Sequence, residues 1–118
     1  MQTEQMTGST PVAARLLVRM HQLLWQASAE ADRRARASRD LVTVALANNL
    51  TYACDRVFHL LPTASLDALL DRPEVTGADP VDLARQAVAL SRTQPLQDFP
   101  PGMASVLVLL IDTVGEFS

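Results

Sequence analysis

Hydrophobic residues recur at helical spacing along most of this chain. Neither Gly nor Pro occurs between Val12 and Leu61, and apolar residues repeat there every three or four positions, as on the buried face of an amphipathic helix. Leu46 follows Leu16 by thirty positions, which is not a multiple of seven, so the pattern consists of two stripes that are out of step. The first stripe is Val12 or Ala13, Leu16, Leu17, Met20, Leu23, Leu24, Ala27 and Ala31, and the second is Val42, Leu46, Leu50, Ala53, Val57, Leu60 and Leu61.

The stripes are separated by residues 31–40, "ADRRARASRD", in which Ala is the only apolar residue type. Ser38 can cap a new helix that begins at Arg39. We therefore predict an antiparallel hairpin of two long helices with its tip near residues 36–39, and a single bent helix is the alternative. Thr10 and Pro11 are typical of the start of the first helix. Residues 1–9 are polar and aperiodic, and we expect them to form a mobile tail.

Proline and aspartate divide the second half of the chain. Pro62 ends the second long helix, and "TASLDALLD" (residues 63–71) predicts a short helix capped by Thr63 or Ser65. After a loop, Asp79 and Pro80 predict the start of another helix, which runs to about Thr93.

The last segment, "MASVLVLLIDTVGEF" (residues 103–117), has an apolar centre that would also suit a buried strand. Its large apolar residues keep helical spacing and no other strand is available to pair with it, so we predict a helix. The fold class is therefore an all-α, small helical bundle of four main helices plus one short helix, formed by a single domain over residues 10–118. The residues with this spacing are Met103, Leu107, Leu110, Val114 and Phe117.

Composition narrows the class of function. The 118 residues carry a net charge of −3, so the chain as a whole should not attract nucleic acid or an anionic membrane. All ten basic residues are Arg, a bias typical of translation from a GC-rich bacterial genome. The lone Cys54 excludes an intramolecular disulfide. No signal peptide and no apolar run of membrane-spanning length is present, and we expect a cytoplasmic protein.

One polar row stands out on the second long helix. Asn48, Tyr52, Asp55 and His59 follow one another at spacings of four, three and four, so they share one helix face. Asp55 can orient His59 as a base while Tyr52 and Asn48 bind a small molecule, which makes these residues the candidate catalytic and ligand-binding set. The alternative is an ordinary solvent-exposed face. Because apolar residues flank the row on both sides, this helix is expected to be central, and the burial of the row decides between the two interpretations.

A second strip lies beside the main apolar face of the first helix. Val18, His21 and Trp25 are its central members, and large aromatic residues with one polar end are favoured in interfaces. The strip either covers the C-terminal helix within one copy or contacts a partner or a second copy. Only two His residues exist, without Cys or carboxylates at zinc-ligand spacing, so we expect no metal and no cofactor.

The arginine-rich segment between the long helices invites an anion-binding interpretation. However, Glu30 precedes Arg34 and Asp32 precedes Arg36 by four positions, and Asp40 follows Arg36 by four, so the charges largely neutralise one another. No aromatic residue is interleaved. A solvated hairpin tip is favoured, and nucleic acid is an unlikely partner.

Arg15 and His21 in "RLLVRMH" resemble, in type and spacing, the Arg and His pair of the small all-α HEPN ribonucleases. That motif usually has a polar residue after its Arg, where this chain has Leu16. Six positions along an uninterrupted helix also put the two side chains on different faces. The resemblance implies a weaker alternative function, a ribonuclease that uses Arg15 and His21.

An excess of apolar helix surface over one small core, without a convergent catalytic set, favours a non-catalytic function. Our first hypothesis is a small accessory or regulatory protein that acts through helix-mediated protein–protein interaction, as a homodimer, with Val18, His21 and Trp25 in its interface. The alternative is a small-molecule-binding protein or small enzyme that uses the polar row on the second helix.

Overall fold

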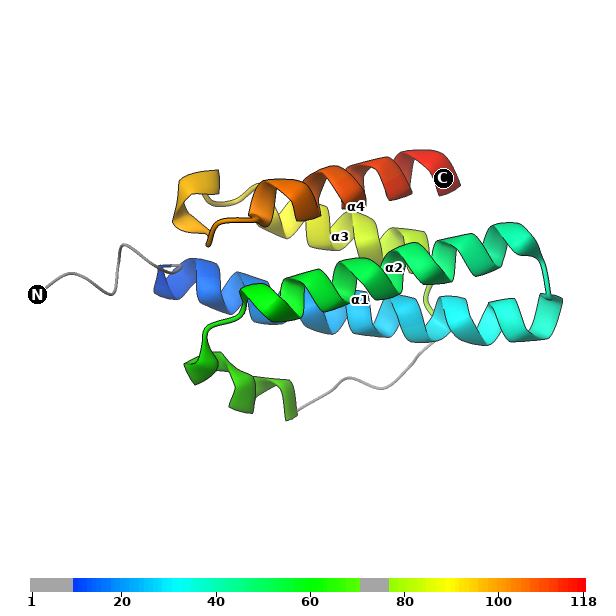
Figure 1. The fold of residues 1–118 in the computed structure, drawn as a ribbon, viewed down its shortest axis with the longest axis horizontal. Helices are drawn as coiled ribbons and strands as arrows, with labels where there is room; N and C mark the ends of the chain where they lie inside the picture. Colours follow the sequence, from blue (N-terminus) through cyan, green and yellow to red (C-terminus); the bar gives the residue numbers. More distant parts are fainter. Residues whose placement is uncertain (1–9, 71–76) are drawn as a thin grey trace, which may run out of the picture.

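A computed structural model describes residues 10–70 and 77–118 of the chain. Within these residues it contains helices and no strand, which confirms the predicted all-α bundle of four main helices with a short helix after the hairpin (Figure 1). The predicted tail over residues 1–9 and part of the predicted loop, residues 71–76, lie outside the described residues. The helices are α1 (Pro11–Ser38), α2 (Leu41–Leu60), α3 (Pro80–Ser91) and α4 (Met103–Phe117), with the short 3-10 helices η2 (Thr63–Leu70) and η3 (Leu96–Asp98).

The four main helices form a ring around one core. α1 packs against α2 and α3, and α4 closes the ring by packing against the same two helices. Figure 1 shows that α1 and α4 run in one direction while α2 and α3 run in the other. The core is aliphatic, and its largest fully buried apolar side chains are Leu17, Met20, Leu24, Leu50, Val57, Met103, Val106 and Leu110.

Local sequence signals account for most helix starts. The Thr10 hydroxyl accepts a hydrogen bond from the Ala13 amide at 3.1 Å, and the Asp79 carboxylate accepts one from the Asp82 amide at 3.1 Å. A proline follows each cap in the first turn, where a missing N–H leaves no bond unmade. Both helices therefore begin where the sequence predicts, and α3 ends at Ser91, two residues before the predicted end.

The hairpin is confirmed, but its tip lies further along the chain than predicted. α1 continues to Ser38, Arg39 adopts a left-handed conformation with φ of 56°, and α2 begins at Leu41. Asp40 caps α2 by accepting a hydrogen bond from the Thr43 amide at 3.3 Å. Ser38 does not cap α2, because its hydroxyl accepts from the Asp40 amide within the turn.

The hairpin is longer than the helices that pack on it. α1 and α2 have 28 and 20 residues, whereas α3 and α4 have 12 and 15. At about 1.5 Å per residue, α1 is roughly 20 Å longer than α4, and in Figure 1 the hairpin end extends past the end of α4. The second apolar stripe is therefore buried only in part: Leu50 and Val57 are fully buried, whereas Val42, its first member, is 61% exposed.

Candidate functional site

The polar row on α2 lies on an open surface. Asn48, Tyr52, Asp55 and His59 are all exposed, on the side of α2 opposite its core residues. The expectation that α2 is central is wrong, because in the described structure the helix packs mainly against α1 and α4 and its outer face is exposed. Three grooves are described in the structure, and no residue of the polar row lines any of them.

His59 is oriented by the backbone. Its Nδ1 lies 2.8 Å from the carbonyl oxygen of Asp55 and 3.6 Å from the nearer carboxylate oxygen of the same residue. Because a carbonyl oxygen only accepts, Nδ1 carries the proton and donates it, which leaves the Nε2 lone pair for solvent. The side chains of both residues are more than half exposed. An exposed pair of this kind has no surrounding groups that would fix a substrate beside His59, as general-base catalysis requires.

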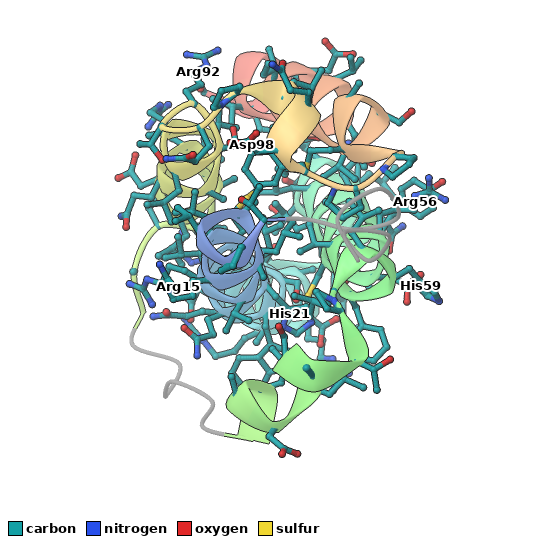
Figure 2. The ribbon with its side chains drawn as sticks, turned by 90° about the vertical axis from the view of Figure 1, so that its left-hand side faces the viewer. Arg15, His21, Arg56, His59, Arg92 and Asp98 are labelled. Atoms are coloured by element: carbon teal, nitrogen blue, oxygen red, sulfur yellow. The ribbon has the colours of Figure 1, made fainter. Side chains whose placement is uncertain are left out.

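The strip on α1 is partly covered within one copy. His21 is buried, its ring lies 5.9 Å from that of Phe58 between centroids, and its carbonyl accepts a long contact from the Cys54 thiol at 3.9 Å. Val18 and Trp25 are half-buried. η2 packs against α1, and Figure 2 places His21 on the side of α1 that faces η2. In this copy the neighbours of His21 are therefore α2 and η2.

Arg15 and His21 do not form a common site in one copy. Arg15 is exposed, whereas His21 is buried against Phe58. Figure 2 shows the two side chains on different sides of α1, as six positions on an uninterrupted helix require. Within one copy, the pair lacks the convergence that acid–base cleavage of RNA needs.

The most ordered charged cluster is centred on Glu30, whose side chain is only 1% exposed. Arg33 Nε donates to Glu30 Oε1 at 3.1 Å and Arg34 Nε donates to Oε2 at 2.7 Å, and a second Arg33 nitrogen also reaches Oε2. Arg34 then extends to the start of α3, where it donates to the Gly77 carbonyl at 3.2 Å and lies 3.5 Å from an Asp79 carboxylate oxygen. The prediction of a fully solvated cluster is therefore wrong at Glu30.

Hydrogen bonds from Arg33 and then Arg34 lower the pKa of Glu30 from its ordinary value of 4.5 to about 2, against an opposing effect of burial. The same carboxylate raises the pKa of Arg33. Both guanidinium groups are thus committed to an internal partner. This cluster ties α1 to α3 and is not an open anion site.

The charges nearer the hairpin tip are exposed. Arg36 pairs with Asp32 at 3.0 Å, as predicted. The predicted pair between Arg36 and Asp40 is not formed among the described residues, since the Asp40 carboxylate caps α2. Arg39 takes part in none of the ion pairs of the described structure, so its guanidinium is available at the tip.

A groove of about 330 Å³ lies where the projecting hairpin meets the start of α3 and the end of α4. Six of its ten lining residues are apolar, and the other four are Arg34, Ser38, Thr43 and Asp79. Leu41, which immediately precedes the lining residue Val42, is 82% exposed. The lining residues are Ala31, Arg34, Ser38, Val42, Thr43, Leu46, Asp79, Pro80, Val81 and Phe117.

Neither this groove nor the exposure of Leu41 and Val42 was predicted from the sequence. Both residues belong to a regular apolar pattern, and helical spacing does not tell where a neighbouring helix ends. The available signal was length: arms of 28 and 20 residues cannot be covered along their whole length by helices of 12 and 15. The combined tip and groove, which we call the tip surface, consists of Leu41, Val42 and the groove-lining residues.

Three further findings concern metal ligands, membrane-spanning helices and similarity to known proteins. In the described residues, no three or more His, Cys, Asp or Glu side chains gather as a metal site requires. None of the helices described here combines the length and hydrophobicity needed to cross a membrane. No protein-family model, curated protein or solved structure matches the chain.

Proposed function

We propose that this chain is a non-catalytic accessory protein that binds a protein partner through the tip surface. The observation that carries the proposal is the pair of aliphatic side chains at the start of α2, Leu41 and Val42, which are 82% and 61% exposed beside an apolar groove. A continuous apolar patch with a charged rim is the usual character of a protein-binding surface.

Comparison with the other helices supports this assignment. Val12 at the chain's first turn is the one large hydrophobic residue exposed on α1, and α3 exposes none among the described residues. Val108 and Ile111 are exposed on α4 and do not line this groove, although Ile111 lines a second groove between α3 and α4. Of the two described grooves that have large exposed aliphatic side chains in their lining, the groove of the tip surface is the larger, at about 330 Å³ against about 130 Å³.

The chemistry of the polar groups also favours binding over catalysis. The strongest charged cluster, around Glu30, is internally satisfied. The Asp55 and His59 pair is open to water, and a general base needs a shielded site that fixes its substrate. An interaction protein requires neither, since its affinity comes from buried apolar anchors.

Site-specific photocrosslinking tests the proposal. A photoreactive amino acid is placed at Leu41 in the chain expressed at its native level in its source cells, with the same probe at Thr51, an exposed position on the outer face of α2, as the control. We expect protein adducts from position 41 and few from position 51, and we expect Val42→Glu to abolish them. Equal labelling at both positions, or no adduct at position 41, would contradict the proposal.

A further inference from the structure

We propose that the partner of the tip surface is the hairpin tip of a second copy of this chain, so that two copies interlock about a two-fold axis. This inference rests on the proposed function and identifies its partner. It is carried by three features of the tip: its shape, the position of its aliphatic residues and the distribution of unpaired charges around it.

The shape is complementary to itself. The hairpin extends beyond α4, so each copy has a projection and, beside it, a step at which the groove lies (Figure 1). When two such copies are related by a two-fold rotation, the projection of each can occupy the step of the other. The same patch then supplies both the inserted element and its receptor, which is the property of an isologous dimer interface.

The residues at the step suit an aliphatic insertion. Val42 and Phe117 line the groove from opposite helices, and the exposed Leu41 lies next to Val42 on the projecting arm. In the interlocked pair, Leu41 and Val42 of each copy lie against the groove of the other. Burying four branched side chains at the centre of one interface gives the apolar cluster that commonly dominates binding energy.

Charges at the two ends of the interface are complementary. Arg39 at the tip forms none of the ion pairs of the described residues. At the end of α4, Asp112 and Glu116 are exposed and likewise belong to no ion pair described here, and no basic residue lies in the last turn of that helix. The negative end of the α4 dipole adds to this field. Interlocking brings the Arg39 guanidinium of one copy to the Asp112 and Glu116 carboxylates of the other. The other charges at these two ends already have partners in their own copy, since Asp40 caps α2 and Arg85 bonds to Asp82 and Ser118.

The conformation of Arg39 fits the same arrangement. Its φ of 56° is a left-handed conformation that Gly or Asn adopts with less strain. The Cβ of Arg39 is therefore unfavourable for the turn itself. In the dimer the guanidinium of Arg39 gains carboxylate partners from the second copy, which it does not have in the isolated hairpin.

Sedimentation velocity on the purified full chain tests the inference. We expect a concentration-dependent dimer whose dissociation constant rises about thirty-fold or more in Leu41→Glu and in Val42→Glu, the range of an interface hot spot. Val108→Glu is the matched control, because Val108 is 58% exposed on α4 and does not line the groove. It should leave the dimer unchanged. Circular dichroism verifies that each variant keeps the helical fold.

Charge reversal gives a sharper test. Arg39→Glu and Glu116→Arg should each weaken the homodimer, because each places like charges together at both ends of the interface. Mixing the two variants should restore association, since every contact in the mixed pair then joins opposite charges. Recovery in the mixture is not expected from any effect of the substitutions on folding alone.

A monomeric wild-type chain at all concentrations would overturn the inference, as would a dimer that responds to Val108→Glu and not to Leu41→Glu. Failure of the dimer inference can be told apart from failure of the proposed function. If position 41 crosslinks to a different protein while the purified chain is monomeric, the binding surface is correct and the second copy is not its partner. If position 41 gives no adduct, the proposed function fails as well.

Discussion

Glu30 on α1 and Asp55 on α2 each have a basic residue four positions later, yet the two carboxylates occupy very different surroundings. The Glu30 side chain is 1% exposed and accepts hydrogen bonds from two arginines. The Asp55 side chain is mostly exposed, and its nearest approach to His59 is 3.6 Å. The same spacing thus gives an organised cluster on one helix and a loose surface pair on the other.

The difference arises from what lies beside each helix. α3 begins next to Glu30, and Arg34 joins the carboxylate to the Gly77 carbonyl and to Asp79. In the described structure, the face of α2 that carries Asp55 is exposed. A pair of charges interacts more strongly when neighbouring elements restrict both partners and exclude water. The spacing of the two residues in the sequence therefore does not determine how strongly they interact.

Removing the Glu30 carboxylate should destabilise the fold more than any change to the Asp55 and His59 pair. Glu30→Gln retains one acceptor oxygen but turns an amide NH₂ toward arginine donors, which leaves guanidinium groups without their anion. We expect this variant to lower the thermal unfolding midpoint more than the other substitutions discussed below. Differential scanning calorimetry at neutral pH measures it, and an unchanged midpoint would show that the cluster does not stabilise the fold.

Acid should act on the same group. The folded-state pKa of Glu30 is about 2, below its ordinary value of 4.5, so the unfolded chain binds the proton more readily. The stabilisation is fully present above about pH 4.5 and is lost as the pH falls toward 2. We expect the urea midpoint to fall less steeply over this range in Glu30→Gln than in the wild type. Parallel curves for the two proteins would contradict the assignment.

Arg34→Lys tests the connection to α3. A lysine keeps the positive charge but cannot span Glu30 and the Gly77 carbonyl with a planar set of donors. Loss of one such hydrogen bond should cost about 1 kcal/mol of unfolding free energy. Arg36→Lys is the control, because Arg36 has a single exposed partner, Asp32, and it should change little. Urea denaturation compares the two variants.

Asp55→Asn should have the smallest effect. An exposed pair at this spacing contributes about 0.3 kcal/mol or less, and the Nδ1 contact of His59 is made with the Asp55 backbone, which the substitution retains. Urea denaturation should therefore give nearly the wild-type free energy. A loss of unfolding free energy comparable with that of Glu30→Gln would mean that the outer face of α2 is covered in solution. The polar row would then again be a candidate ligand-binding site.

The helices were predictable because their signals are local. Thr10 with Pro11 and Asp79 with Pro80 specify their helix starts through bonds within a few residues. The link from Glu30 through Arg34 to Gly77 and Asp79 was not predictable, because the last two residues lie more than forty positions away from Arg34. The exposure of Val42 depends similarly on where α4 ends. The spacing of residues in the sequence shows which of them share a helix face. Which faces are exposed to water depends on how the helices pack.

The left-handed residue between α1 and α2 also decides the overall form of the molecule. If Arg39 and Asp40 adopted helical angles, residues 11–60 would form one rod roughly 75 Å long. Leu16 and Leu46, thirty positions apart, would then face directions about 120° apart around that rod, since each residue turns the helix by 100°. No straight neighbour could cover both stripes. The reversal at Arg39 therefore brings together two apolar surfaces that a continuous helix would keep permanently apart.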